Sequence, residues 1–181
     1  MTELASRHPR PEHQALTVPG PGTGPADVIE LVLADHRRIR RLSRALDDAV
    51  RRATHSGPGW VPAHIWQRLA ELLHAHTLAE EEICYLPASR HSARAVAHMR
   101  DRAAEHDDIR EAIAEAALQP AGSALWWHAV RAVQADVLPH FDREESGLLV
   151  NLRRQLTPRQ RVELGRQWTA FIATWTLDAS R

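Results

Sequence analysis

From Asp27 onward, the apolar residues of this 181-residue chain recur at steps of three, four and seven, the spacing of an amphipathic helix. No segment of useful length alternates apolar and polar residues as a half-buried strand does. Glycine and proline interrupt the pattern at intervals, with short connections between the helical stretches. We therefore expect an all-α fold: an up-down four-helix bundle with an additional C-terminal helix, because short connections favour antiparallel neighbours.

Five helices are expected. They cover about residues 27–54, 62–85 and 92–118, then a stretch from about 123 and another from 157. Pro87 marks the loop after the second helix, and Pro139, inside the fourth, predicts a kink or a helix end there. The fifth helix opens at Thr157, with Pro158 at its first position and Gln160 completing a capping box.

Each expected helix has one inward face that is mostly apolar. The inward residues are Val32, His36, Ile39, Leu46 and Val50; Ile65, Leu69, Leu72, His76, Glu80 and Ile83; Met99, Ala103, His106, Ile109 or Arg110, Ile113 and Ala117; Trp126, Val130, Val133, Val137, His140, Glu144 and Leu148; and Val162, Trp168, Ile172 and Trp175. Histidine and glutamate interrupt the first four of these faces.

Composition divides the chain and limits its class. Residues 1–26 are rich in proline and glycine and are predicted to form a flexible tail. We expect residues 27–152 to form the bundle and residues 153–181 to form a C-terminal helix that packs on the bundle or extends from it.

The charges of the chain balance, because Lys plus Arg and Asp plus Glu each number 23, and this argues against a nucleic-acid or anionic-membrane partner. One cysteine excludes an internal disulfide, and with no signal-peptide features or spanning apolar run we expect a cytoplasmic protein.

The second and fourth expected helices share the motif His-x3-Glu, as His76 with Glu80 and His140 with Glu144. This spacing puts both side chains on one helical face, within reach of a common metal ion or metal pair. The spacing alone is weak evidence, because 12 histidines and 23 acidic residues produce such pairs by chance. His8 begins a third pair, but its proline-broken tail has no helix to present it.

The position of these two motifs distinguishes them from chance pairs, because both interrupt an inward apolar face. The first and third helices also have one histidine each on their inward faces, His36 and His106. Burying four imidazoles and two carboxylates without partners costs several kcal/mol per charge, and bound metal removes that cost. A lone inward histidine is usually satisfied by a hydrogen bond, and a glutamate run is usually a solvated face. Four helices that each offer a ligand favour a metal site, and nitrogen and oxygen donors suit iron, manganese or zinc.

Four elements carry a family resemblance over about residues 27–152. They are Asp35-His36, His76-x3-Glu80-Glu81-Glu82-Ile83, Glu105-His106 and His140-x3-Glu144-Glu145. In this order they resemble the hemerythrin-like (HHE cation-binding) family. The resemblance implies a four-helix bundle around a non-haem di-iron centre with an oxo or hydroxo bridge. The implied terminal ligands are His36, His76, His106 and His140, and the implied bridging carboxylates are Glu80 and Glu144.

The third helix departs from the pattern of oxygen-carrying members, which have a His-x3-His pair there. Arg102 and Arg110 lie four residues before and after His106. His98, eight residues back, is about 12 Å away along a helix, too far for a metal pair about 3.5–4 Å across. The missing fifth histidine leaves room for exogenous ligands at the metals.

Other notable residues are expected to be structural. Tyr85 stands one place before Leu86-Pro87, where the family commonly has Tyr-Pro. Cys84 is expected to be a core thiol, and His74 to face away from the site. Most of four further histidines are expected at the surface: His55, His64, His91 and His128.

The resemblance implies binding of dioxygen, sensing of oxygen or iron, or chemistry on peroxide and nitric oxide. The first hypothesis is a cytoplasmic protein with two iron ions that binds dioxygen, nitric oxide or peroxide, with peroxide consumption as a variant and Glu81 or Glu145 as outer acids. The alternative is an iron- or oxygen-sensing regulatory module whose metal occupancy controls stability or partner binding. A third reading is a metal-free helical interaction domain. The sequence leaves open whether the protein is an enzyme and what its oligomeric state is.

Overall fold

The computed structural model describes residues 26–53, 60–89 and 93–178. Almost all of the predicted tail, and the connection after the first expected helix, lie outside these ranges. The elements in chain order are α1 (Val28–Ala53), α2 (Trp60–Ala79), η1 (Glu80–Tyr85), α3 (Leu86–Ser89), α4 (Ala93–Ala117), α5 (Ala124–Arg143), η2 (Glu144–Leu148), α6 (Leu149–Gln155) and α7 (Pro158–Asp178). Here η denotes a π-helical stretch.

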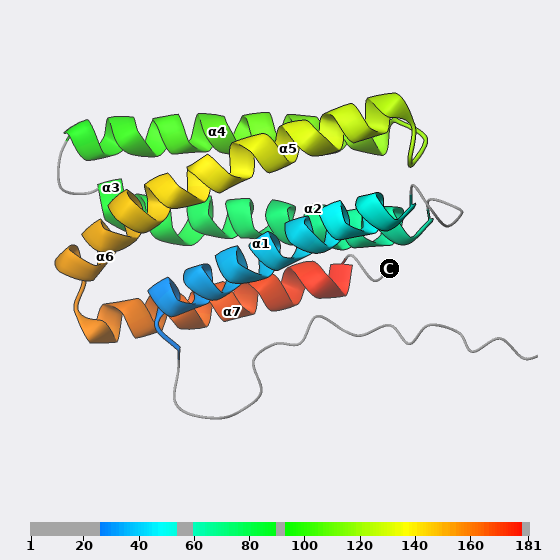
Figure 1. Cartoon of the computed structure of the whole chain (residues 1–181). Coiled ribbons are helices and arrows are strands. Elements are labelled where there is room, and N and C mark those ends of the chain that lie inside the picture. Colours follow the sequence, from blue (N-terminus) through cyan, green and yellow to red (C-terminus); the bar gives the residue numbers. More distant parts are fainter. Residues whose placement is uncertain (1–25, 54–59, 90–92, 179–181) are drawn as a thin grey trace, which may run out of the picture.

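Four long helices form the bundle, and a fifth covers one side of it. α1 packs against α2, α4 packs against α5, and α7 lies along α1 and α2 (Figure 1). Every element in the described residues is helical. The predicted all-α bundle with an additional C-terminal helix is therefore confirmed.

The core consists of two apolar clusters with a polar belt between them. Along α1, Val32 belongs to one cluster, Ile39 belongs to the other, and the buried side chain of His36 lies between them in sequence. In α2 the order is reversed: Leu72 of the second cluster comes before His76, and Ala79 of the first comes after it. The belt therefore crosses the bundle where the two clusters meet, out of reach of solvent.

Two predicted helix starts are confirmed by their capping hydrogen bonds. The backbone N–H of Trp126 donates to the side chain of Ser123, 3.1 Å away, at the start of α5. Before α7, the backbone N–H of Thr157 donates to Gln160 Oε1 at 2.8 Å, and the N–H of Gln160 donates back to Thr157 Oγ1 at 3.3 Å. This reciprocal pair is the predicted capping box.

Two local predictions were wrong, at Pro87 and at Ala117, and one of the two alternatives for Pro139 did not occur. The chain stays helical through Pro87, because the fixed φ of proline suits the start of α3. The helix does not end at Pro139, because this proline lies on the exposed side of α5, where water can satisfy the freed carbonyl. Ala117 is exposed and Ala116 is buried in its place, seven residues after the buried Ile109.

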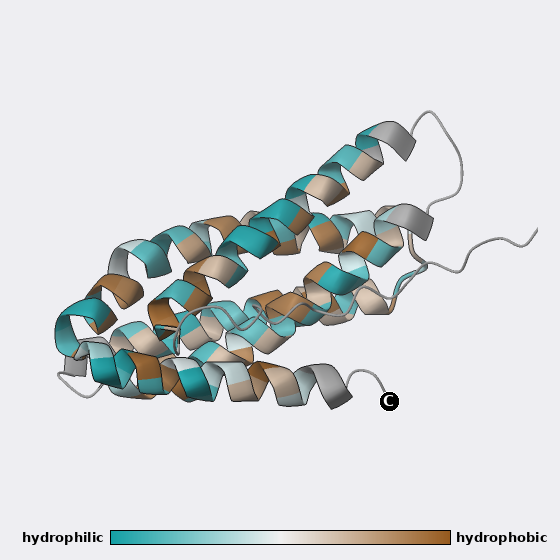
Figure 2. Cartoon of the chain, turned by 90° about the horizontal axis from the view of Figure 1, so that it is seen from below, coloured by the Kyte–Doolittle hydropathy of each residue, from teal (hydrophilic) through white to brown (hydrophobic). Residues whose placement is uncertain are grey.

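Most other predicted inward residues are buried or half-buried, and the inward face of the fourth predicted helix is buried throughout, from Trp126 to Leu148. Val50 has a side chain outside the described part. Hydrophobic and hydrophilic residues occur together along each long helix (Figure 2), which is the pattern of helices with one buried face. Within the described ranges, no helix has the length and apolar character needed to cross a membrane.

Candidate metal centre

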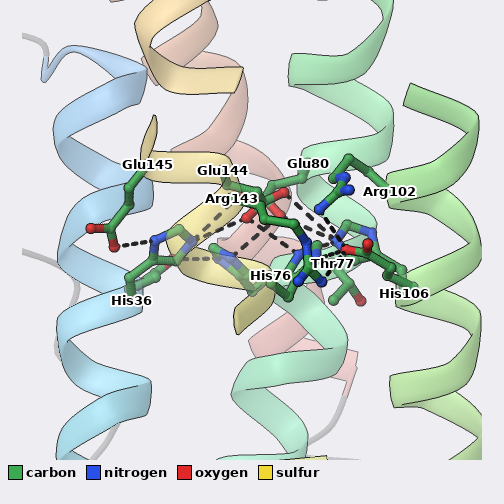
Figure 3. A network of polar contacts seen from close by, with 12 residues as sticks. His36, His76, Thr77, Glu80, Arg102, His106, Arg143, Glu144 and Glu145 are labelled. Carbon is green, nitrogen blue, oxygen red and sulfur yellow. Dashed lines mark hydrogen bonds and ion pairs between the residues drawn. The ribbon is translucent and has the colours of Figure 1, made fainter. Parts of the chain in front are cut away.

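The structure brings the six predicted ligands together in the polar belt. They are His36 on α1, His76 on α2, Glu80 on η1, His106 on α4, His140 on α5 and Glu144 on η2. Each has a side chain that is at most 1% exposed. Figure 3 shows the carboxylates of Glu80 and Glu144 between His36 on one side and His106 on the other.

Both His-x3-Glu motifs end where an α-helix becomes a π-helix. Glu80 is the first residue of η1 and Glu144 is the first residue of η2. A π-helix pairs residues five apart instead of four, and such single turns occur frequently at functional sites. The two motifs therefore share a local conformation that the regular spacing of their apolar residues does not reveal.

The first ligand group joins His36, His76, Glu80 and Glu144, whose ligand atoms lie within 4.8 Å of one another. His36 Nε2 is 3.4 Å from Glu144 Oε2, and His76 Nε2 is 3.4 Å from Glu80 Oε2. Two imidazoles and two carboxylates thus converge on one point.

The second group joins His106 and His140 to the same two glutamates, again within 4.8 Å. His106 Nε2 is 3.5 Å from Glu80 Oε2, and His140 Nε2 is 3.3 Å from Glu144 Oε2. Glu80 and Glu144 are therefore members of both groups. Two ligand groups that share two carboxylates are compatible with two neighbouring cation positions.

Several inward atoms have no hydrogen-bond partner although they are buried. They are His36 Nε2, His76 Nδ1 and Nε2, Glu80 Oε1 and Oε2, and Glu144 Oε2. Leaving such an atom unsatisfied costs about 1–3 kcal/mol, and more for a charged group. A cation at each ligand group would satisfy five of these six atoms, all but His76 Nδ1, and the nitrogen and oxygen donors suit iron, manganese or zinc. The residues present fit a pair of metal ions.

The two central carboxylates differ in their affinity for a proton. Burial raises the pKa of both, and the charge of Glu144 raises the pKa of Glu80 further, well above its ordinary value. The polar contacts of Glu144 with His140 and His36, 3.3 and 3.4 Å away, outweigh burial and hold the pKa of Glu144 well below the ordinary value. A cation between the two carboxylates would favour the ionised form of both.

Three of the four histidines donate their outer N–H to a carboxylate. Nδ1 is 2.9 Å from Glu145 Oε1 at His36, 2.9 Å from Glu81 Oε1 at His106 and 2.7 Å from Glu105 Oε2 at His140. Such bonds fix the ring orientation and leave the inner nitrogen free to bind metal. The hypothesis that Glu81 and Glu145 are outer acids agrees with this geometry, whereas sequence reasoning missed the same role for Glu105.

The outer carboxylates can be located in the sequence from the inner ligands. Each one is adjacent in sequence to an inner ligand: Asp35 to His36, Glu81 to Glu80, Glu105 to His106 and Glu145 to Glu144. Each one faces the histidine of a neighbouring helix, so the contacts run from α1 to α2, from η1 to α4, from α4 to α5 and from η2 back to α1. The acid–ligand dipeptides thus form a ring around the centre.

Two arginines hold this ring in place. They lie four residues before and after His106, where oxygen-carrying members of the family have a further histidine. Arg102 contacts Glu105 at 2.7 Å, and Arg110 contacts Glu81 at 2.8 Å. Arg143 adds a second contact to Glu105 at 3.0 Å. Burial alone would raise the pKa of both carboxyls, but hydrogen bonds from the histidines and from Arg110 and Arg143 lower it. Neither Arg102 nor Arg110 replaces a metal ligand; both keep an outer acid ionised.

Tyr85 lies against the second ligand group, which sequence reasoning did not predict. Its hydroxyl donates to Glu144 Oε1 at 3.2 Å and is 3.0 Å from His106 Nε2. Tyr85 comes five residues after Glu80, and the π-helical turn of η1 brings residues at this spacing onto one face. Burial, followed by the charges of Glu80 and Glu144, raises the pKa of the phenol, so Tyr85 keeps its proton.

The other histidines and the cysteine lie away from the ligand groups or are inert. His64 and His128 are exposed as expected, and His55 and His91 are outside the described residues. His74 stacks on Trp175 of α7 with ring centroids 4.9 Å apart. Cys84 has a free, fully buried thiol, and burial raises the pKa of this thiol. It is a core residue, as expected.

A helical bundle whose buried belt offers two groups of histidine and glutamate ligands is a metal-binding helical domain. A family model described as the hemerythrin HHE cation binding domain matches residues 27–152, and the chain therefore belongs to that family. The match includes all six predicted ligands and excludes α7. In two further comparisons, no curated protein and no solved structure matches the chain.

Proposed function

We propose that the protein holds a pair of iron ions and binds dioxygen or a related small ligand, nitric oxide or peroxide. The observation that carries the proposal is that Glu80 and Glu144 belong to both ligand groups. In this assignment His36 and His76 are terminal ligands at the first position, His106 and His140 are terminal ligands at the second, and the glutamates bridge. Iron held by these residues would supply electrons and open coordination sites to the small ligand.

The ligand count supports a site that accepts an outside molecule. Each position has two imidazoles and two carboxylate oxygens, fewer than the six ligands that an octahedral ion takes. Arg102 and Arg110 contact the outer carboxylates and occupy no ligand position. The chain therefore leaves coordination sites open beside its own ligands.

Tyr85 gives the proposed site a hydrogen-bond donor for an oxygen-containing ligand. Its hydroxyl keeps a proton in a buried place 3.0 Å from His106 and 3.2 Å from Glu144. A neutral O–H donor at this point orients an oxygen-containing ligand and holds a proton available for it. We place Tyr85 as the proton-holding residue of the proposed site.

The test uses the iron-reconstituted, reduced protein exposed separately to dioxygen, nitric oxide and hydrogen peroxide. The proposal predicts a new visible absorption band with at least one of these ligands and, for the peroxide variant, consumption of peroxide. Stable and reversible oxygenation without peroxide turnover would remove the peroxide variant and leave oxygen binding. An iron-loaded protein that gives no spectral response to any of the three would contradict the proposal.

A second candidate is a sensing module whose metal occupancy controls stability or partner binding. It is favoured by the unpaired buried atoms of His36, His76, Glu80 and Glu144, which destabilise the bundle unless a cation satisfies them. Limited proteolysis and gel filtration of iron-loaded and iron-free protein test it. Identical protease resistance and oligomeric state in the two forms would exclude this candidate.

A further inference from the structure

A tryptophan of α7 packs directly on one of the proposed metal ligands. The ring of Trp168 meets the ring of His76 edge to face, with centroids 5.5 Å apart and an interplanar angle of 74°. Trp168 is only 3% exposed. α7 lies outside the residues that match the family, so this contact is a feature of this chain beyond the matched domain.

His76 differs from the other three histidines in how its ring is held. Its Nδ1 is 3.8 Å from Asp35 Oδ2, beyond hydrogen-bond distance, and has no other partner. The other three histidines have outer bonds of 2.7–2.9 Å. The ring of carboxylates is thus weakest at His76, and the His76 orientation depends on packing against aromatic neighbours, Phe141 and Trp168.

α7 is itself fixed to the bundle by contacts remote from the metal centre. Arg161 Nε donates to Asp27 Oδ2 at 2.6 Å, which joins the start of α7 to the start of α1. One turn further, Gly165 approaches the backbone of Ala26 so closely that a Cβ there would lie 1.9 Å from the carbonyl oxygen. These contacts set the position of Trp168, and through it the position of His76.

We propose that Trp168 is a positioning residue for His76, so that the metal position of His36 and His76 depends on the docking of α7, whereas the position of His106 and His140 does not. The inference rests on the proposed pair of metal positions. It makes the two positions unequal, with the first one more easily lost. None of the other three histidines has a ring contact with an α7 residue among those observed.

The test is the iron content of full-length variants after reconstitution and dialysis against a fixed chelator concentration. Trp168→Leu removes the ring, and Trp168→Phe keeps an aromatic edge at the same place. Trp126→Leu is the matched control, because Trp126 is also 3% exposed but lies in the apolar cluster away from the ligands. Unfolding midpoints of the iron-free variants show whether the two leucine variants are comparably destabilised.

The inference predicts that Trp168→Leu loses about half of the iron of the wild type, while Trp168→Phe and Trp126→Leu keep nearly all of it. It also predicts that Trp168→Leu added to His76→Ala removes no further iron, because both act on the same position. Full iron in Trp168→Leu, or loss of all of it, would overturn the inference and leave the proposed function standing. A wild type without iron would remove the proposed function and this inference together.

Discussion

Glu105 accepts a hydrogen bond of 2.7 Å from Nδ1 of His140, across the interface between α4 and α5. Glu105 is also the sequence neighbour of His106, which donates the same kind of bond to Glu81. The inner and outer layers of the centre are therefore built from the same dipeptides. A helix that supplies a ligand to the centre also orients the ligand of the next helix.

Replacing Glu105 by glutamine should weaken metal binding without removing a ligand. The change removes the charge that orients His140 and makes it more basic, and loss of such an outer partner costs about 10- to 100-fold in metal affinity. Competition with a chelator of known affinity measures the effect. Glu111→Gln, at an exposed position of the same helix, should bind metal as the wild type does. Equal affinity for the two variants would show that the bond from His140 does not tune the site.

Tyr85→Phe should keep the fold and the iron and lose peroxide chemistry. The ring remains buried and only the hydroxyl near His106 and Glu144 is removed. If this hydroxyl transfers a proton, peroxide consumption should fall about 10²- to 10⁴-fold. Iron content and unfolding midpoint are measured alongside, and wild-type turnover at equal iron would assign the proton to another group.

Gly165→Ala should destabilise the protein by about 1–3 kcal/mol, because a methyl group at residue 165 would meet the backbone of Ala26 at the α1–α7 contact. Gly147→Ala is the control, since no atom lies within 4 Å of its added Cβ. Chemical unfolding of both variants compares the free energies of unfolding. Equal stability of the two would mean that α7 does not dock on α1 as described.

Metal should stabilise the fold, because it satisfies buried groups that otherwise have no partner. At a free metal concentration 100-fold above the dissociation constant, the gain is about 2.7 kcal/mol. Thermal unfolding of the iron-free protein with and without added iron(II), under anaerobic conditions, measures it. The His76→Ala/His140→Ala variant should show no rise in melting temperature, and a rise equal to that of the wild type would place the binding elsewhere.

The helical spacing of apolar residues predicted the bundle well, because burial of one face decides where each long helix lies. His36, His76, His106 and His140 were predicted inward by that pattern alone, and all four are buried. The end of the third inward face was misplaced by one residue, from Ala116 to Ala117, where the pattern has no large side chain to fix its phase.

The conformation around the two glutamates was not predictable from the same pattern. A π-helical turn shifts the hydrogen-bond partner by one residue and moves Tyr85 onto the site. The stretch is a single turn, which is too short for the apolar spacing to reveal it. The contact between His76 and Trp168 joins residues far apart in sequence. The helical pattern of α7 predicts that Trp168 faces inward, but not which residue it contacts. The acid–ligand dipeptides were visible in the sequence, but their targets depend on which helices are neighbours.

The number of iron ions per chain, measured by elemental analysis after anaerobic reconstitution, tests the central claim most directly. We predict about two per wild-type chain, as expected for two positions that share Glu80 and Glu144, with loss in the His76→Ala/His140→Ala variant. A control with two exposed histidines replaced, His64→Ala/His128→Ala, should keep the wild-type content. A folded wild type that binds no iron would contradict the account and make the inward histidines part of the structural core.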